Sequence, residues 1–169
     1  EALHQLVSVV EAATEELDVT FLGSDVDHDG GKLILTAGAP TVTGDDEERM
    51  LLAVRKIADA GVPLALRIGV NRGAIFAGDI GPPYRRTYTV MGDGVNLASR
   101  LESACKAYSA RILVSESTVA KLRGTYRLRD IDLVIVKGKT QPVRVFEILD
   151  YHDAQTFPNL LDVVGHFGE

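Results

Sequence analysis

The chain contains a single cysteine, no tryptophan and few aromatic residues, which make up 6% of its 169 residues. One cysteine cannot form an internal disulfide, so the sequence is not that of a disulfide-stabilised secreted domain and fits a reducing, cytoplasmic compartment. Lysine and arginine number 18 against 24 aspartates and glutamates, and this acidic balance predicts no nucleic-acid partner. No apolar run approaches the ~18 residues that a membrane-spanning helix needs, so we expect no membrane partner.

The residues that are present fit an ordinary globular domain. Hydrophobic residues make up 46% and charged residues 25% of the chain, which is typical of a domain with a substantial core. The sequence opens with Glu1 and shows no signal-peptide pattern, so we expect a piece of a longer protein. Cys105 falls on the apolar side of a predicted helix, and we interpret it as a packing residue rather than a nucleophile.

Hydrophobic periodicity predicts several helices. Apolar residues at helical spacing predict one helix over residues 3–17. A run of acidic residues predicts the start of a second helix, which Gly61 and Pro63 end. A third helix is predicted to begin at Asp93, and Ser115 is placed to cap a short fourth one.

Strands are predicted between these helices. Residues 19–24 and 32–37 predict a hairpin around a polar turn at 25–31, and residues 64–70 alternate as a half-buried strand does. We expect residues 74–78 to pair back on that strand. Further strands are predicted at residues 111–114, 126–136 and 143–148. The pattern predicts an α+β fold with helices on a mostly antiparallel sheet, in a ferredoxin-like order that lacks its opening strand.

The most informative stretch is a strand, a Gly-Asp-Gly turn and a helix between Arg85 and Glu102. Asn96 and Arg100 are four residues apart and share one helix face. The apolar stripe beside them consists of Leu97, Leu101, Ala104 and Tyr108. Burial of this stripe would leave an amide and a fixed cation at the helix edge, which suits an anionic ligand with hydroxyl groups. Alternatively, Asn96 hydrogen-bonds a neighbouring loop and Arg100 pairs with a local carboxylate such as Glu102.

The run GDGVNLASRL resembles the Gly-Asp-x-Val-Asn-x-Ala-x-Arg-Leu motif of the class III nucleotidyl cyclases. Two further segments agree in the same order: residues 66–78 resemble that family's Arg-Ile-Gly strand pair, and residues 136–143 resemble its Lys-Gly loop. The resemblance implies a cyclase domain over residues 1–150. Residues 151–169 are then an extension, weakly similar to the lead-in to a nucleotide-binding ATPase module, that continues into a further domain.

The resemblance also implies roles for individual residues. Asn96 would orient the ribose of ATP, and Arg100 would stabilise charge at the α-phosphate as cyclic AMP forms and pyrophosphate leaves. Lys137 would contact the terminal phosphates and Thr89 the purine. The plainer alternatives are that Lys137 and Lys139 are solvated turn residues and that Thr89 is an ordinary cross-strand threonine. The implied function is an adenylate cyclase domain in intracellular nucleotide signalling.

The metal-binding residues of the family are not matched. Its first metal-binding aspartate lies on an opening strand that this sequence lacks, and Gly31 holds the place of the second, with Asp29 as the nearest carboxylate. The chain therefore resembles the second, metal-poor domain of soluble adenylyl cyclases. This implies that Mg or Mn is supplied through a second cyclase domain, in a homodimer or pseudo-heterodimer. The alternative is a degenerate domain that regulates or dimerises without turnover.

The first predicted turn also matches the opening of a calcium-binding loop, from Asp25 to Gly30. The twelfth loop position is Thr36, whereas calcium-binding loops of this pattern carry a glutamate there that binds the ion through both oxygens. The flanking segments are also predicted strands rather than helices. An Asp- and Gly-rich hairpin turn explains the same residues, with His28 in solvent. A small calcium-binding module is therefore the second alternative.

Overall fold

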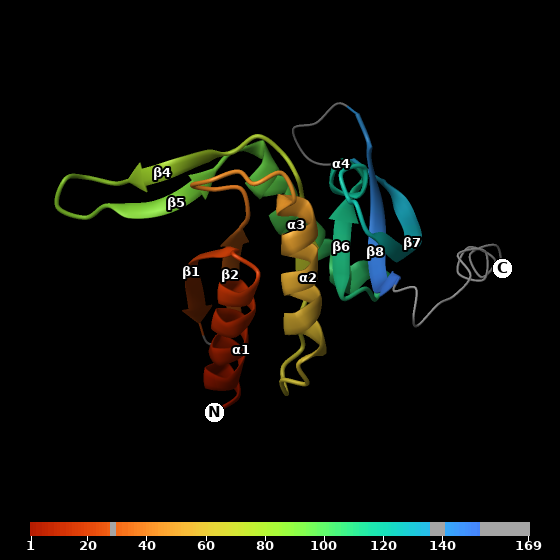
Figure 1. The fold of residues 1–169 in the computed structure, drawn as a ribbon, viewed down its shortest axis with the longest axis horizontal. Helices are drawn as coiled ribbons and strands as arrows, with labels where there is room; N and C mark the ends of the chain where they lie inside the picture. Colours follow the sequence, from red (N-terminus) through yellow and green to blue (C-terminus); the bar gives the residue numbers. More distant parts are fainter. Residues whose placement is uncertain (28–29, 136–140, 153–169) are drawn as a thin grey trace. The chain divides into compact units, whose positions relative to one another are not determined.

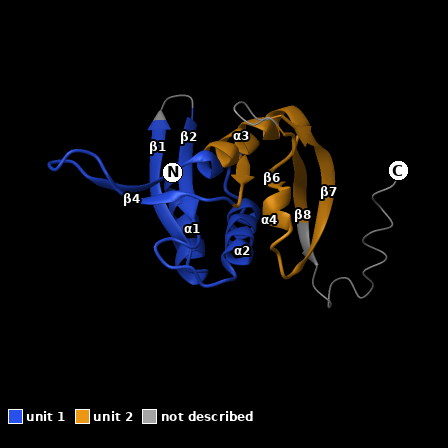
Figure 2. Cartoon of the chain, turned by 90° about the horizontal axis from the view of Figure 1, so that it is seen from above, with its two compact units in different colours: residues 1–65, 73–95 blue, residues 66–72, 96–169 orange. Residues whose placement is uncertain are grey.

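The computed structural model describes residues 1–27, 30–135 and 141–152 (Figure 1). The chain divides into two compact units, of which unit 1 comprises residues 1–65 and 73–95 and unit 2 comprises residues 66–72 and those from 96 onward (Figure 2). The elements in chain order are α1 (Ala2–Glu16), β1 (Thr20–Asp27), β2 (Gly30–Thr36), α2 (Asp46–Asp59), β3 (Ile68–Val70), β4 (Phe76–Ile80), β5 (Thr87–Met91), α3 (Asp93–Tyr108), β6 (Ile112–Ser115), α4 (Glu116–Val119), β7 (Thr125–Val134) and β8 (Val143–His152).

In unit 1, helices α1 and α2 contact each other through apolar faces. The buried apolar side chains of the two helices are Leu6, Val10, Ala13, Leu51, Ala53, Val54 and Ile57. Each fully buried leucine or isoleucine contributes about 2 kcal/mol. Helix α2 has three acidic residues in its first turn, which favour the helix dipole, and Gly61 follows its end with a φ of 69°. The predicted limits of this helix are thereby confirmed.

The β1–β2 hairpin is longer than the sequence predicted. Asp27 pairs with Gly30, so the two strands occupy most of the segment 25–31 that we expected to be a turn. Gly30 has a φ of 149°, a backbone conformation that residues with a Cβ rarely adopt. Asp25 lies opposite Lys32, an opposite-charge pair that favours continued strand pairing.

The second hairpin of unit 1 corrects a predicted pairing. We expected residues 74–78 to pair with residues 64–70, but β4 pairs antiparallel with β5. The intervening turn explains the difference, because Gly81 has a φ of 126° and closes the chain tightly. A Cβ at Gly81 would lie 2.2 Å from the carbonyl oxygen of Arg85. The turn therefore requires glycine and joins the two strands directly.

Unit 2 is built on a four-stranded sheet in the order β3-β6-β8-β7. Strand β3 runs parallel to β6, and the other pairs are antiparallel, which confirms the mostly antiparallel sheet. Strand β3 is shorter than predicted, since the expected residues from Leu64 to Arg67 lie outside it. Among the helices in the described part of the chain, none has the length and hydropathy that a membrane span requires.

The core of unit 2 forms where α3 packs on this sheet. Its buried members are Leu97, Leu101, Cys105, Ala110, Leu113 and Val145, with Ala104 and Tyr108 packed against them. The predicted apolar stripe of the helix is thus confirmed. Burial raises the pKa of the Cys105 thiol, which keeps it protonated and fits its interpretation as a packing residue.

Candidate functional site

Helix α3 presents Asn96 and Arg100 on its exposed face in unit 2. Their exposure follows from the burial of Leu97 and Leu101, because the apolar stripe turns the adjacent helix face toward solvent. The side chains are separated by about one helical turn. The helix therefore offers an amide and a guanidinium together, as the sequence predicted.

A close backbone approach fixes the orientation of α3 on the sheet. A Cβ at Gly69 would lie 2.1 Å from the carbonyl oxygen of Ala98 and 2.4 Å from the amide nitrogen of Glu102. Because both of these atoms belong to the helix backbone, no side-chain rotation could relieve the clash. The glycine of strand β3 is therefore required for α3 to lie where its exposed face carries Asn96 and Arg100.

The carboxylate that we considered as a partner for Arg100 is paired elsewhere. The Nε atom of Arg67 lies 3.2 Å from Oε1 of Glu102, and the hydroxyl of Ser103 donates to the other carboxylate oxygen. Within residues 1–27, 30–135 and 141–152, the side chains of Asn96 and Arg100 form no hydrogen bond or ion pair. Their donors are thus available to a ligand rather than committed to the described fold.

The turn that precedes α3 belongs to unit 1 and is shaped by two glycines. Gly92 has a φ of 129°, and its carbonyl accepts a hydrogen bond from the Val95 amide. A Cβ at Gly94 would lie 3.3 Å from both the carbonyl oxygen of Ala74 and Cγ2 of Ile75. The first turn of the helix can therefore lie close against residues 74–75.

Thr89 is half-buried on strand β5 of unit 1. Its cross-strand neighbour is Gly78, which has no side chain to pair with it. The space beside Gly78 is filled by the Phe76 ring, from which a Cβ at Gly78 would lie 3.3 Å. Lys137 and Lys139, the predicted phosphate contacts, lie outside the described residues.

Gly31 lies in strand β2 opposite Val26 and supplies no metal ligand. Asp29 and His28 lie outside the described residues. In the part of the chain that the structure describes, no group of three or more His, Cys, Asp and Glu side chains is placed to hold a metal ion. Asp25 belongs to the extended strand β1 rather than to a loop that curves around a cation, so the structure gives the calcium-binding alternative no support.

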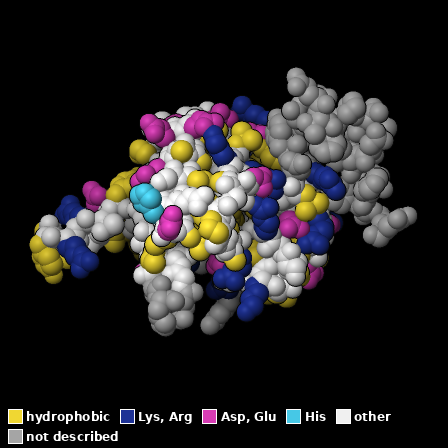
Figure 3. Space-filling view, turned by 90° about the horizontal axis from the view of Figure 1, so that it is seen from below, with side chains coloured by type: hydrophobic (Ala, Val, Ile, Leu, Met, Phe, Trp, Pro, Cys, Tyr) yellow, Lys and Arg dark blue, Asp and Glu magenta, His cyan; other side chains and the backbone are white. Residues whose placement is uncertain are grey.

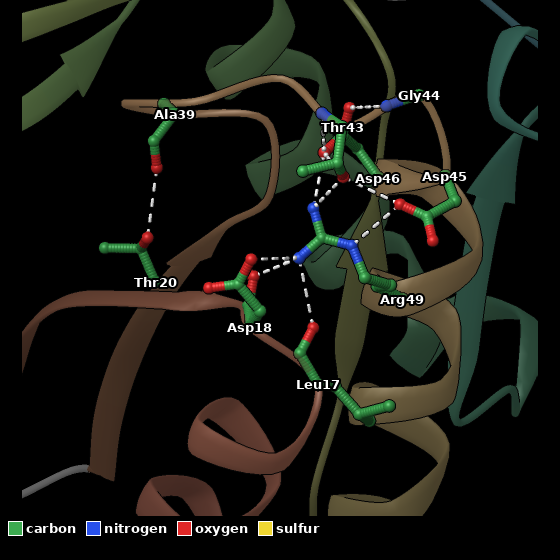
Figure 4. A network of polar contacts seen from close by, with 9 residues as sticks. All are labelled: Leu17, Asp18, Thr20, Ala39, Thr43, Gly44, Asp45, Asp46 and Arg49. Carbon is green, nitrogen blue, oxygen red and sulfur yellow. Dashed lines mark hydrogen bonds and ion pairs between the residues drawn. The ribbon is translucent and has the colours of Figure 1, made fainter.

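A polar network that the sequence did not lead us to expect is centred on Arg49 of α2 in unit 1 (Figure 4). This side chain is only 13% exposed. Its guanidinium donates to Thr43, Asp45, Asp46 and the carbonyls of Leu17 and Asp18. The network ties the end of α1 to the start of α2. The spacing of Asp45 and Asp46 before Arg49, at i+4 and i+3 on one helix, was the available signal.

The network also shifts the ionisation of Asp45 and Asp46. Hydrogen bonds from Thr43 and then from Arg49 lower the pKa of Asp45. For Asp46, burial opposes ionisation, but hydrogen bonds from the Thr43 and Gly44 amides and from the Thr43 and Arg49 side chains outweigh it and lower the pKa. Both carboxylates are therefore held charged beside the guanidinium, in a structural role.

Comparison with known proteins agrees with this fold and motif. The model of the adenylate and guanylate cyclase catalytic domain matches residues 47–149. The terminal-differentiation specific adenylate cyclase of Dictyostelium discoideum is 40% identical over 87 residues, which cover 49% of this chain and 4% of that protein. The adenylate cyclase of Anabaena cylindrica is 39% identical over 92 residues, or 52% of this chain and 18% of that protein. The chain thus corresponds to a small part of either relative.

The solved guanylate cyclase domain of RhGC from Catenaria anguillulae, in complex with GTP, has a TM-score of 0.72 to this chain. The two sequences are 25% identical, and the match covers 89% of this chain and 83% of that domain. The predicted α+β cyclase fold is therefore confirmed. Since the family model also matches more than half of the sequence, the chain belongs to the adenylate and guanylate cyclase catalytic domain family.

Proposed function

We propose that this chain is one half of a dimeric adenylate cyclase that converts ATP into cyclic AMP and pyrophosphate. Cyclase domains of this family bind nucleotides and act as dimers. The observation that carries the proposal is the exposed pair Asn96 and Arg100 on α3, which no described residue engages. A domain retained only for its fold would not need this pair.

In the proposed reaction, the ribose 3′-oxygen loses its proton and bonds to the α-phosphorus, and the bond from this phosphorus to the bridging oxygen of pyrophosphate breaks. Arg100 stabilises the negative charge that develops on the α-phosphoryl oxygens, since its planar guanidinium matches two oxygens at once. Asn96 holds the ribose so that the 3′-oxygen is aligned for attack. Lys137 binds the terminal phosphates, and Thr89 contacts the edge of the base.

Cyclases of this family use divalent metals such as Mg or Mn. The described residues do not fit such a site, because Gly31 stands at the place of a metal-binding carboxylate and no cluster of ligands forms in the described ranges. We therefore propose that a second cyclase domain supplies the metal-binding residues. A homodimer would repeat Gly31 in both halves, which favours a partner of different sequence.

ATP is the proposed substrate because the curated relatives are named adenylate cyclases and because threonine at position 89 resembles the adenylyl cyclase pattern. GTP is the competing substrate, since the structural neighbour from Catenaria anguillulae is a guanylate cyclase. We also propose that residues 1–150 form the cyclase domain of a longer cytoplasmic signalling protein, with residues 151–169 leading to its next domain.

The test is a cyclase assay of the purified chain, alone and mixed with a cyclase domain that retains both metal-binding aspartates. We expect negligible product from the chain alone and metal-dependent cyclic AMP from the mixture, with less product from GTP. Robust activity of the chain alone would refute the need for a metal-supplying partner. The presence of Gly31 favours a degenerate regulatory domain as the second candidate, and this alternative predicts no turnover in the mixture.

A further inference from the structure

A buried group of hydroxyls lies where β6 passes into α4 in unit 2. Ser115 is the last residue of β6 and Thr118 belongs to α4. Figure 3 shows Lys, Arg, Asp and Glu side chains at the molecular surface, whereas Ser115 and Thr118 are only 0% and 1% exposed. Because water does not reach these two hydroxyls, their hydrogen-bond partners must come from the fold itself.

The two hydroxyls form a chain of hydrogen bonds that begins and ends on the segment that follows β3. The Arg72 amide donates to Oγ1 of Thr118 at 2.8 Å, and Oγ of Ser115 donates to Oδ1 of Asn71 at 2.6 Å. The two hydroxyl oxygens are 3.0 Å apart. Since a hydroxyl has one proton and that of Ser115 is donated to Asn71, Thr118 donates to Ser115. All three bonds therefore run in one direction, which strengthens each of them.

A third hydroxyl holds the same piece of backbone from its other side. Ser117 of α4 donates to the Arg72 carbonyl at 3.0 Å, so side chains of α4 bind both the amide and the carbonyl of Arg72. Strand β3 has only three residues, and its ladder with β6 ends at Val70. We call the side chains of Ser115, Ser117 and Thr118 the hydroxyl clamp. It continues the attachment of β3 beyond the end of the ladder.

Strand β3 is also the strand on which α3 rests. A Cβ at Gly69 would lie 2.1 Å from the carbonyl oxygen of Ala98 and 2.4 Å from the amide nitrogen of Glu102. These two helix residues stand two positions before and two positions after Arg100. The turn of α3 that carries Arg100 therefore lies directly against β3. Because the contact is between backbone atoms, a displacement of β3 would move this turn as well.

We propose that the hydroxyl clamp positions Arg100 for catalysis by fixing the end of β3. The inference rests on the proposed function and adds residues that the cyclase motif does not contain. Ser115 and Thr118 are positioning residues, since they are buried and act on Arg100 only through β3 and α3. A misplacement of about 1 Å in a catalytic group can lower a rate about 10²-fold, so a strand of this length benefits from a second attachment.

The experiment is steady-state kinetics of the full chain mixed with a cyclase domain that retains both metal-binding aspartates. Thr118→Val keeps the shape of the side chain and removes the hydroxyl that joins Arg72 to Ser115. We expect kcat to fall about tenfold while KM for ATP changes little, because the charge that Arg100 stabilises develops near the transition state. Thr118→Ser retains the hydroxyl and should restore most of the lost kcat.

Thr14→Val is the matched control. Thr14 is also a buried threonine, 6% exposed, and its hydroxyl donates to the Val10 carbonyl at 2.8 Å within α1 of unit 1. This substitution removes a buried hydroxyl without changing the attachment of β3, so kcat should stay at the wild-type value. Thermal melts of both variants establish that the assays are made on folded protein.

Equal falls of kcat in Thr118→Val and Thr14→Val, or no recovery in Thr118→Ser, would overturn the positioning role. An unchanged kcat in Thr118→Val would overturn it as well. If Thr118→Val does not fold, Ser117→Ala tests the clamp from its exposed side: a smaller fall in kcat supports the proposal, and an unchanged kcat overturns it. Absence of cyclic AMP from the wild-type mixture would instead refute the proposed function, and the inference with it.

Discussion

Arg100 is exposed on α3. In the proposed reaction its guanidinium stabilises the negative charge that develops on the α-phosphoryl oxygens near the transition state. We therefore expect Arg100→Ala to lower kcat about 10²-fold while KM for ATP changes little. Asn96→Ala should also lower kcat, because a misplaced ribose loses alignment. Steady-state kinetics of the chain complemented by a metal-binding partner domain measure both effects.

Two controls accompany this prediction. Arg100→Lys keeps the charge but loses the planar fork, so its kcat should fall between those of wild type and Arg100→Ala. Lys106→Ala removes another exposed cation of α3 and should leave kcat unchanged. Neither Asn96 nor Arg100 belongs to the buried stripe, so all these variants should melt near the wild-type temperature. An unchanged kcat in Arg100→Ala would remove this residue from the site.

Arg49 is expected to matter for stability rather than for catalysis. Its side chain is 13% exposed, and its guanidinium bridges three carboxylates and two backbone carbonyls just past the end of α1. Its removal leaves these groups without their shared donor, so Arg49→Ala should lower the free energy of unfolding by about 3 kcal/mol. Urea denaturation measures the change.

The control for Arg49 lies on the same helix. Arg55 pairs with Asp59, which is half exposed, at a spacing of one helical turn. Such pairs contribute about 0.5 kcal/mol, so Arg55→Ala should destabilise the chain much less than Arg49→Ala. An equal decrease in the free energy of unfolding of the two variants would show that the network around Arg49 stabilises the fold no more than this ordinary ion pair does.

At the scale of elements, the packing of α3 on β3 depends on Gly69. A Cβ at this position would lie 2.1 Å and 2.4 Å from helix backbone atoms, so Gly69→Ala must push the helix away from the strand. We expect a loss of about 3 kcal/mol or more, as overpacking against backbone cannot be relieved by a new rotamer. Gly23→Ala is the matched control, because a Cβ there meets nothing within 4 Å. Comparable melting temperatures of the two variants would contradict this packing.

At the scale of the whole molecule, stability should fall in acid partly through the Arg49 network. Asp45 and Asp46 have pKa values lowered from 3.8, so the unfolded chain binds protons more readily than the folded chain. Their contribution is present above pH 3.8 and is lost as the pH falls through the lowered pKa values. The difference in melting temperature between wild type and Arg49→Ala should therefore shrink below about pH 4. If the difference in melting temperature stays constant as the pH falls, protonation of Asp45 and Asp46 does not weaken the Arg49 network.

The sequence predicted most elements, but several of their partners could not be predicted. Helix α3 and its buried stripe could be predicted because Leu97 and Leu101 lie at helical spacing. Any fold that buries one face of a helix requires apolar residues at this spacing, whatever the helix packs against. The pairing of β4 with β5 was predicted wrongly, because strand alternation shows which face is buried and does not show which strand lies alongside. The Arg49 network was missed because two of its acceptors are backbone carbonyls of the segment that follows α1, far from Arg49 in the sequence.

The sequence by itself determined the family, the predicted identity of the ligand-facing pair and the absence of a carboxylate at Gly31. These follow from residue type and spacing along one segment, which are local properties. Only the tertiary structure showed that Glu102 pairs with Arg67. It also showed that the absence of a side chain at Gly69 lets the backbone of α3 pack closely against β3. The strand register placed Phe76 on the same hairpin face as Thr89. Each of these depends on which segments meet, and that choice results from burial and strand pairing summed over distant parts of the chain.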